Sequence, residues 1–391
     1  ICTFLINCLY LQKNMNNMVG KVGVIVSIVL FCIAVGVYSF VQLSVADKGK
    51  DVDLLSFVPL ESVGLLETDN PDFLANEFPQ TTYGLQLDTL RQSGLFPMVL
   101  NAVFPNADST VHRLSNGIER MMISFHAPMS ARNVVMYFRT HGSGREFLQR
   151  MMQRQGRRFV PKKESYRGSD IDIYALENGD FIAAYCGKGF CILSYQKSLI
   201  EQVIDARKDD VSLREDAVFM ECYEGKAVNF ITLYGHAPSL PFLVRDCASC
   251  WSSFDIHLNS EVFYLSGSMV LPDSCRFRVT DRLYQMDSVS EDGLLVLSGQ
   301  EKVDSCISRM ISIPQHTLFE ECVSNLSRDA SFIFVADMDK LKGGDMLQVG
   351  GFYLPKFVMQ HVDLFRSFIF SAQVTKVGNK YSHIIVFTYK N

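Results

Sequence analysis

The sequence has little net charge, sparse cysteine and no low-complexity stretch. Its 37 Lys and Arg residues nearly balance 42 Asp and Glu residues, which leaves a net charge of −5. Because DNA-binding domains usually carry excess basic residues, this balance does not favour a nucleic-acid partner. The 11 cysteines among 391 residues are too few for a disulfide-built scaffold. A 48% hydrophobic content also excludes a disordered chain and a collagen-like fibre, and 20% charged residues exclude a polytopic membrane protein.

Catalytic motifs are also missing from the sequence. No GxSxG, HExxH or paired-histidine pattern occurs. The glycine-rich segment 342–351 lacks the Gly-Lys-Ser/Thr ending that a phosphate-binding loop needs to hold phosphate and magnesium. We therefore expect no cofactor and no metal site, and the sequence leans towards a protein that is not an enzyme.

One long apolar segment is present near the N-terminus. Residues Val22–Ala46 carry no charge, and about 20 apolar residues in a helix suffice to cross a bilayer. Lys13 and Lys21 precede the segment, which favours a cytoplasmic N-terminus. We predict a short cytoplasmic segment 1–21, a transmembrane anchor 22–46 in the inner membrane and a periplasmic body. Cleavage after Ala46 stays open as an alternative, although the apolar run is longer than signal peptides usually have.

Strand patterns dominate the rest of the chain. Apolar or alternating runs on either side of turn residues predict hairpins over 181–195, 254–271 and 367–389. Helical patterns lie between them, at 144–155, 197–207, 303–311 and 355–365. We predict an α+β fold with mostly antiparallel sheets and interspersed helices, preceded by one transmembrane helix.

A weak repeat suggests internal duplication. Segments 227–240 and 330–341 each read as a strand with a polar bend, followed through a connection by one of these hairpins, and 63–74 with 121–140 resembles a third copy. This pattern predicts a short linker 47–56, a first α+β module 57–225 and a second module 226–391.

The densest charge lies in the stretch from Arg139 to Arg167, which has nine basic and two acidic residues. On a helix that starts near Ser143, four arginines fall on one side, with apolar residues on the neighbouring arc. They are Arg150, Arg154, Arg157 and Arg158. The pattern predicts a guanidinium surface for an acidic partner, which could be an envelope protein, a lipid headgroup or an acidic glycan. The alternative is a solvated face that pairs with the acidic remainder of the chain.

Two cysteine pairs stand out. Cys247 and Cys250 form a CxxC motif beside Trp251, a spacing that suits thiol–disulfide exchange, half a zinc site, or a structural pair of thiols or a disulfide. Cys186 and Cys191 flank a predicted hairpin turn, where a cross-strand disulfide could form.

Three phrases of the sequence look familiar together: Phe57–Glu67, Trp251–Leu258 followed by Leu265-Ser-Gly267, and Ile313–Thr317. They resemble a family of uncharacterised, N-terminally anchored envelope proteins of Gram-negative bacteria with repeated strand-rich modules. The resemblance covers about residues 20–391 and implies a place on the extracytoplasmic face of the inner membrane. From these observations we expect a membrane-anchored, non-catalytic binding or scaffold module. The alternative is an envelope thiol–disulfide oxidoreductase that uses Cys247 and Cys250.

Overall fold

The structure is a computed structural model of residues 1–391. It describes residues 52–70, 117–154, 160–176, 179–223, 231–236, 249–275, 289–340 and 365–390, apart from 129, 131, 259–261 and 274. The chain divides into two units, Ile1–Val52 and Asp53–Asn391. All of the elements below belong to the second unit.

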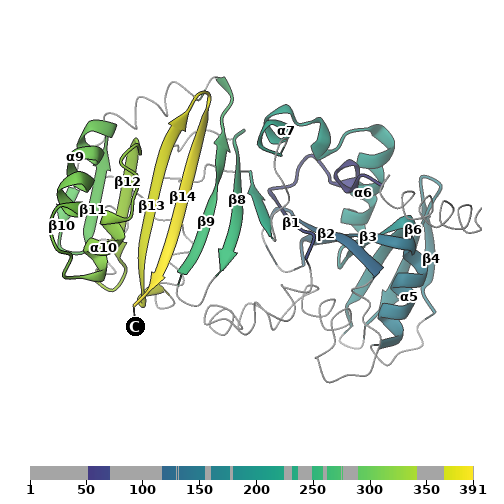
Figure 1. Ribbon diagram of the computed structural model, residues 1–391. Helices are drawn as coiled ribbons and strands as arrows, with labels where there is room; N and C mark the ends of the chain where they lie inside the picture. Colours follow the sequence, from purple (N-terminus) through teal and green to yellow (C-terminus); the bar gives the residue numbers. More distant parts are fainter. Residues whose placement is uncertain are drawn as a thin grey trace, which may run out of the picture. The chain divides into compact units, whose positions relative to one another are not determined.

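The described strands form one 14-stranded sheet, in which each pair of neighbours is antiparallel (Figure 1). Their order across the sheet is β10-β11-β12-β13-β14-β9-β8-β7-β1-β2-β3-β6-β5-β4. The strands are β1 (Gly64–Thr68), β2 (Ile118–Phe125), β3 (Val134–Ser143), β4 (Lys162–Tyr166), β5 (Ser169–Ala175), β6 (Phe181–Ser194), β7 (Thr232–Gly235), β8 (Trp251–Leu258), β9 (Val262–Val270), β10 (Val289–Glu291), β11 (Leu294–Ser298), β12 (Phe332–Asp337), β13 (Phe368–Val377) and β14 (Lys380–Tyr389).

Short helices lie between the strands. The α-helices are α5 (Gly144–Arg154), α6 (Lys197–Asp209), α7 (Ala217–Tyr223), α9 (Gln300–Ile311) and α10 (Leu318–Ser324), and the 3₁₀ turns are η1 (Leu54–Phe57) and η5 (Leu213–Glu215). Helix α10 begins with a capping box, in which the Thr317 side chain accepts from the Glu320 backbone and the Glu320 side chain accepts from the Thr317 backbone.

The helices expected near 144–155, 197–207 and 303–311 are confirmed as α5, α6 and α9. The one expected at 355–365 lies outside the described residues except for Phe365.

Strand β6 folds back on itself. Its first arm pairs with β5, from Phe181 to Ala184, and its second arm pairs with β3, from Phe190 to Ser194. The Sγ atoms of Cys186 and Cys191 lie only 2.7 Å apart. Five steps of extended chain would separate these residues by about 16 Å, so the chain must reverse between them. The hairpin predicted over 181–195 is thus present within β6.

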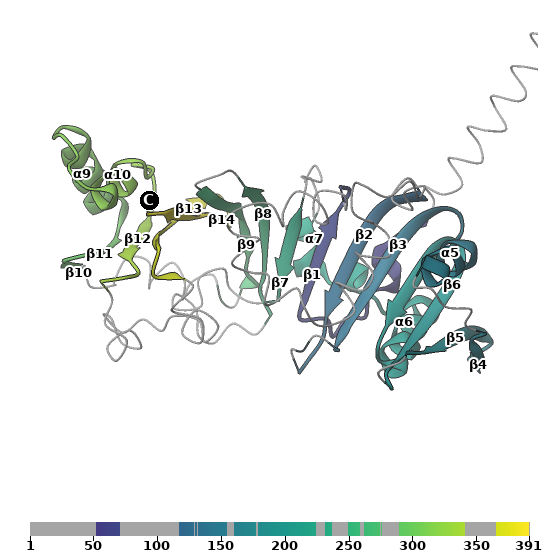
Figure 2. The same cartoon turned by 90° about the horizontal axis from the view of Figure 1, so that it is seen from below.

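Helix α5 covers one face of the sheet. Its apolar side, formed by Phe147, Leu148, Met151 and Met152, is buried in a cluster with alternate residues of β2, β3 and β6. Figure 2 shows α5 beside β3 and β6. The apolar arc expected beside the arginines is therefore the side that fixes α5 to the sheet.

The opposite face carries the other helices. The ring of Phe57 in η1 contacts the rings of Tyr185 and Phe190, which alternate along β6 with the residues that face α5. At the far end, α9 and α10 pack on Leu295, Ile333 and Val335. Register places Ile333 on the same face as Glu67 of β1, because a series of cross-strand partners connects them. The series is Ile333, Gln373, Ile384, Ser266, Asp255, Thr232 and Glu67.

The predicted α+β fold with mostly antiparallel sheets and interspersed helices is wrong, because the described strands form one large antiparallel sheet. Strands from distant parts of the chain pair directly, since β7 lies against β1 and β14 against β9, and this joins all of the described strands into a single sheet. The three segments of the proposed repeat do supply β1 with β2–β3, β7 with β8–β9 and β12 with β13–β14. Duplication and the module boundaries stay predictions.

The membrane prediction also needs correction. Among the described residues, no helix is both long enough and apolar enough to cross a bilayer. The predicted anchor, 22–46, itself lies outside the described residues. The predicted localisation as a single-pass protein of the inner membrane with a periplasmic body therefore has no support from the helices of the structure, and we do not retain it.

Candidate functional site

A buried carboxylate lies near the middle of the sheet. Glu67 of β1 is fully buried, and its neighbour Leu66 points to the opposite face, towards the cluster under α5. Arg120 Nη1 of β2 is 2.8 Å from Glu67 Oε1, and the hydroxyl of Tyr223, at the end of α7, donates to the same oxygen over 3.2 Å. The second oxygen, Oε2, is buried and has no hydrogen-bond partner among the described residues.

The environment of Glu67 favours its protonated form. Burial and, to a smaller extent, the nearby Asp69 carboxylate raise the pKa of Glu67, Arg120 and Tyr223 oppose the shift, and the net pKa is about 7. Arg120 also donates from Nε to Asp69 over 2.8 Å, so its charge is shared between two carboxylates. Glu67 is thus a group that titrates near neutral pH inside the fold. We call Glu67, Asp69, Arg120, Tyr223 and Tyr234 the Glu67 cluster.

A polar row leads from Glu67 to an open part of the same face. Thr232 is the cross-strand partner of Glu67, and its hydroxyl donates to Asp255 Oδ1 over 2.8 Å. Asp255 in turn lies opposite Ser266, and Ser266 lies opposite Ile384. Since directly opposed residues of an antiparallel sheet share one face, these side chains form a continuous row across five strands.

The open part of this face spans β8, β9 and β14. On β14, Tyr381, His383 and Ile385 are buried on one side, whereas Ile384 and Val386 on the other side are half-exposed. The half-exposed or exposed side chains of this face include Asp255, His257, Tyr264, Ser266, Ile384 and Val386. We call this set the sheet platform. The rings of His257 and Tyr264 lie 5.5 Å apart on it.

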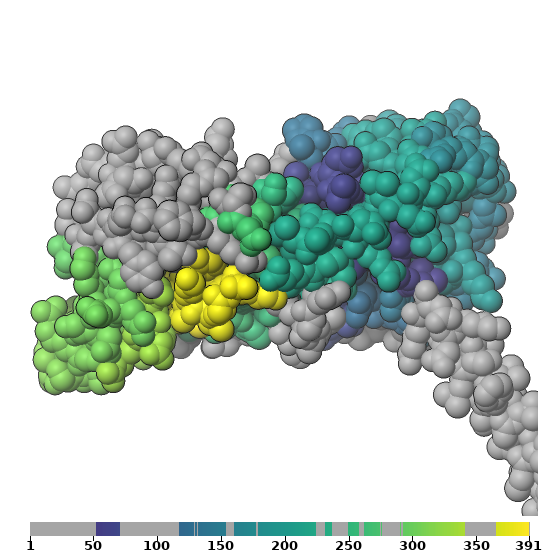
Figure 3. Space-filling model, turned by 90° about the horizontal axis from the view of Figure 1, so that it is seen from above, coloured from purple at the N-terminus to yellow at the C-terminus, as the bar shows by residue number. Residues whose placement is uncertain are grey.

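Helices bound the sheet platform on two sides. Cys222 of α7 contacts the Ser268 carbonyl and Phe219 packs on Trp251, so α7 covers the face just beyond Ser266. On the other side, Cys322 of α10 contacts the hydroxyl of Thr388. In Figure 1, strands β13, β14, β9 and β8 lie between α10 and α7. Figure 3 shows β13 and β14 (yellow) at the surface between the segment with α9 and α10 and the teal segment.

The arginine surface is only partly described. Arg150 is exposed on α5, and its Nε donates to the Glu146 carbonyl of its own helix over 3.3 Å. The side chain of Arg154 and all of Arg157 and Arg158 lie outside the described residues. The surface predicted from these four arginines stays a prediction.

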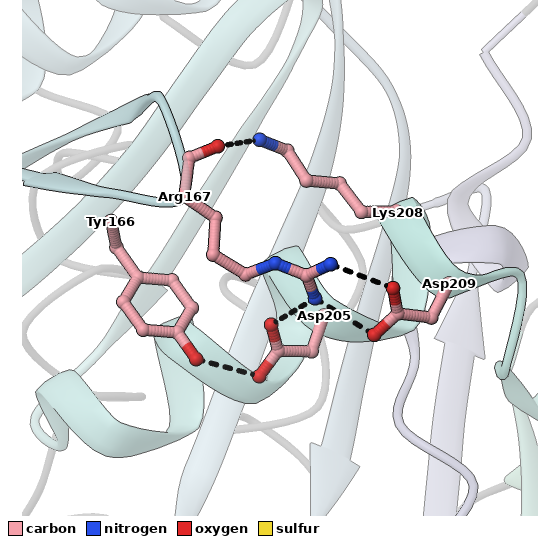
Figure 4. A network of polar contacts seen from close by, with 5 residues as sticks. All are labelled: Tyr166, Arg167, Asp205, Lys208 and Asp209. Carbon is pink, nitrogen blue, oxygen red and sulfur yellow. Dashed lines mark hydrogen bonds and ion pairs between the residues drawn. The ribbon is translucent and has the colours of Figure 1, made fainter.

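Other cations of the basic stretch are neutralised by the fold. Arg145 pairs with Asp170 over 2.9 Å. Arg167 donates to both oxygens of Asp209 and to Asp205, which also accepts from Tyr166 (Figure 4). Arg167 has φ +47° in a two-residue turn between β4 and β5, so these carboxylates of α6 hold a turn in the left-handed region. The charges of Arg145 and Arg167 are therefore neutralised by carboxylates of the same chain.

The CxxC pair is not arranged as an exposed redox site in the part that is described. Cys250 is fully buried and is not in a disulfide, whereas Cys247 lies outside the described residues. Burial raises the pKa of Cys250 to about 11. Cys275 is in a disulfide, and Cys250 is not its partner.

We expect Cys250 to resist alkylation in the native protein. At about pH 8, a pKa near 11 leaves roughly 0.1% of this thiol as thiolate, and thiolate is the reactive form. Iodoacetamide labelling with peptide mapping should modify the half-exposed Cys306 at least about 100 times faster than Cys250. Labelling of Cys250 at the rate of Cys306 would contradict this assignment, and the two rates should converge once the protein is unfolded.

Metal binding has no geometric support in the described ranges. No group of three or more His, Cys, Asp or Glu side chains converges there on one point. The sequence expectation of no metal concerns the whole chain and stays a prediction.

Neither the Glu67 cluster nor the sheet platform was found from the sequence. Glu67 sits in the short run GLLET, where a charged residue ordinarily marks a solvent-facing position. Its burial depends on Tyr223, more than 150 residues later in the chain. The alternation of Phe254–Leu258 did predict two distinct faces on this strand, but not which face stays open.

Comparisons with known proteins give little further guidance. No protein-family model matches the chain, and the search of curated proteins found no similar sequence. One similar solved structure is crystal form I of TP0453, with 10% sequence identity and a TM-score of 0.31, over 62% of this chain and 89% of that one. A TM-score this low does not assign the chain to the fold of TP0453.

Proposed function

We propose that the protein is a non-catalytic binding module, and that the sheet platform holds a basic segment of a partner protein. One observation carries the proposal: side chains on three adjacent central strands remain half-exposed between two helices, α7 and α10. A sheet face of this kind offers hydrogen-bonding groups, an aromatic pair and aliphatic surface together. This combination is typical of the core and rim of a binding interface.

The chemistry of the platform favours a cationic occupant. Asp255 is the acidic residue of the platform, and Glu67 lies two strands further along the same row. Helix α10 adds Glu320 and Glu321 in its first turn. Lys380, near the α7 boundary, already donates to the Glu221 carbonyl. A Lys or Arg side chain that lies across Ser266 could therefore reach Asp255, while its stem packs on Ile384 and Tyr264.

The oxidoreductase alternative receives less support. A nucleophilic thiol works best as an accessible thiolate of lowered pKa, whereas Cys250 is buried and has a raised pKa. The sheet platform instead offers recognition through several weak contacts at once.

Selection of random peptides displayed on phage tests the proposal. The bait is the full chain, and the comparison bait is the double variant Asp255→Asn/Tyr264→Ala. Asparagine still offers an oxygen to Thr232, so the variant removes charge and a ring without opening the core. We expect Lys- and Arg-containing sequences to be enriched on the original protein, and the selected peptides to bind the variant at least about 10-fold more weakly.

A matched control is the variant Asp292→Asn, because Asp292 is an exposed carboxylate far from the platform in sheet order, beside β10. The selected peptides should bind this control as they bind the original protein. No enrichment, or equal binding to the platform variant, would overturn the proposal. Enrichment of acidic peptides would instead support the arginine surface of α5.

A further inference from the structure

We propose that Cys186 and Cys191 form a reversible disulfide across the tip of the β6 hairpin, with Cys186 as the thiol that reacts first. The Sγ atoms of the two residues are 2.7 Å apart, and a disulfide bond needs about 2.05 Å. Two sulfur atoms that are in contact but not bonded lie further apart than either of these distances. Bond formation therefore needs a shift of less than about 1 Å.

The hairpin geometry suits this bond. Because the two arms of β6 run antiparallel around the reversal, Cys186 and Cys191 face each other as a cross-strand pair. The Cα atoms of such pairs are about 4.5–5.5 Å apart, inside the range that disulfides bridge. Gly187 keeps the turn tight, since a Cβ there would lie 2.4 Å from the ring of Phe190. The reversal thus holds the two thiols together before any bond forms.

The surroundings assign different roles to the two thiols. Cys191 is fully buried in the cluster under α5, and Cys186 is half-exposed at its edge. Burial, the neighbouring Cys186 and the largely buried Asp172 all raise the pKa of Cys191. An oxidant from solution therefore meets Cys186 first, and Cys191 is placed to resolve the product.

The reaction balances with a small-molecule disulfide such as oxidised glutathione. The Cys186 thiol loses its proton and attacks one sulfur, which releases one glutathione thiolate and leaves a mixed disulfide on the protein. The Cys191 thiol then loses its proton and attacks the Cys186 sulfur, which releases the second glutathione. Two protein thiols are oxidised to one disulfide, one glutathione disulfide is reduced to two thiols, and the two protons end on glutathione.

Trypsin gives a direct readout, because Lys188 lies between the two cysteines. Oxidised glutathione is added to the full chain, and remaining thiols are blocked before digestion. We expect peptides 168–188 and 189–197 to be recovered as one linked species, which reductant separates. Thiol titration should show the loss of two thiols per chain beyond any at the reference residue Cys306.

Two matched variants test the order of reaction. Cys191→Ser should accumulate glutathione on Cys186, whereas Cys186→Ser should leave Cys191 unmodified over the time in which Cys306 reacts. A stable glutathione adduct on Cys186 of the original protein, with no linked peptides, would overturn the proposal. So would unmodified thiols at both positions after Cys306 has reacted completely. Faster modification of Cys191 than of Cys186 would overturn the assigned roles.

Discussion

Replacing Glu67 with glutamine should abolish a pH dependence of stability. In the original protein, Glu67 lowers the free energy of unfolding by about 3 kcal/mol as the pH rises from 4.5 to 7. Glu67 has a pKa of about 7 in the fold and the ordinary value of 4.5 when unfolded. The folded protein therefore binds more protons than the unfolded chain in this range, and its stability falls as pH rises from 4.5 to 7. Each pKa unit is worth about 1.4 kcal/mol, which gives the expected size.

The effect of Glu67 on the pH dependence of stability must be separated from the effects of the groups that face it. They are Arg120 on β2, Arg139 on β3, Asp69 beyond β1, and Tyr223 and Tyr234 from α7 and β7. The tyrosine pKa values are raised, so the tyrosines stay neutral across this range. The arginines also keep their charge, because arginine deprotonates only far above neutral pH.

A second buried group titrates in the same range with the opposite sign. Burial lowers the pKa of His126 to about 4, so its contribution to stability is complete above about pH 6.5 and is lost as pH falls towards 4. In the original protein, the pH dependence of stability from His126 thus partly cancels that from Glu67. The difference between the original protein and Glu67→Gln isolates Glu67, because His126 is common to both.

Urea unfolding at a series of pH values measures this difference. The gap in unfolding free energy should change by about 3 kcal/mol between pH 4.5 and 7, in the direction that favours the glutamine variant at higher pH. Its absolute size at any one pH also contains the fixed cost of an amide beside Arg120. Parallel pH curves for the two proteins would contradict a raised Glu67 pKa.

Gly267→Ala should destabilise the protein by about 3 kcal/mol or more. Gly267 is in β9, between β8 and β14, and a Cβ at this position would lie 1.7 Å from the Ser253 carbonyl oxygen and 2.7 Å from the carbonyl carbon. Backbone atoms cannot rotate away as a flexible side chain can, so the β8–β9 pair must separate. This pair supports the sheet platform.

Gly235→Ala is the matched control, because it makes the same substitution on β7. A Cβ there would have no heavy atom within 4 Å. Its effect on the unfolding free energy should stay within about 1 kcal/mol. Urea unfolding of both variants compares the midpoints at equal slope. Equal midpoints would show that the close approach of β8 to Gly267 is not present in the protein.

Local features of this fold follow from the sequence, whereas the joining of its strands does not. The turns near Gly378 and Gly187, and the apolar side of α5, depend on residues close together in the chain, so their patterns predicted hairpins and a helix. The pairing of β14 with β9 joins strands that are more than 100 residues apart in the chain, and no local pattern specifies it. Alternation specifies the face of a strand but not its neighbour.

The same limit explains why the site was missed. Asp255 belongs to the alternating strand β8 and Tyr264 to its neighbour β9, and from sequence either face of this pair could have been the covered one. The outcome depends on where α7 and α10 pack, through contacts such as Cys222 with Ser268 and Cys322 with Thr388. Those contacts join residues that are tens of positions apart, and no local spacing encodes them.

Site-specific photo-cross-linking tests the central claim most directly. The photoreactive residue p-benzoylphenylalanine is placed at Tyr264 on the sheet platform, or at Arg150 on the outer side of α5, and a selected basic peptide is added. We expect cross-linking from position 264, lost when Asp255 is also replaced with asparagine, and none from position 150. Cross-linking from position 150 alone, or from neither position, would contradict binding on the sheet platform.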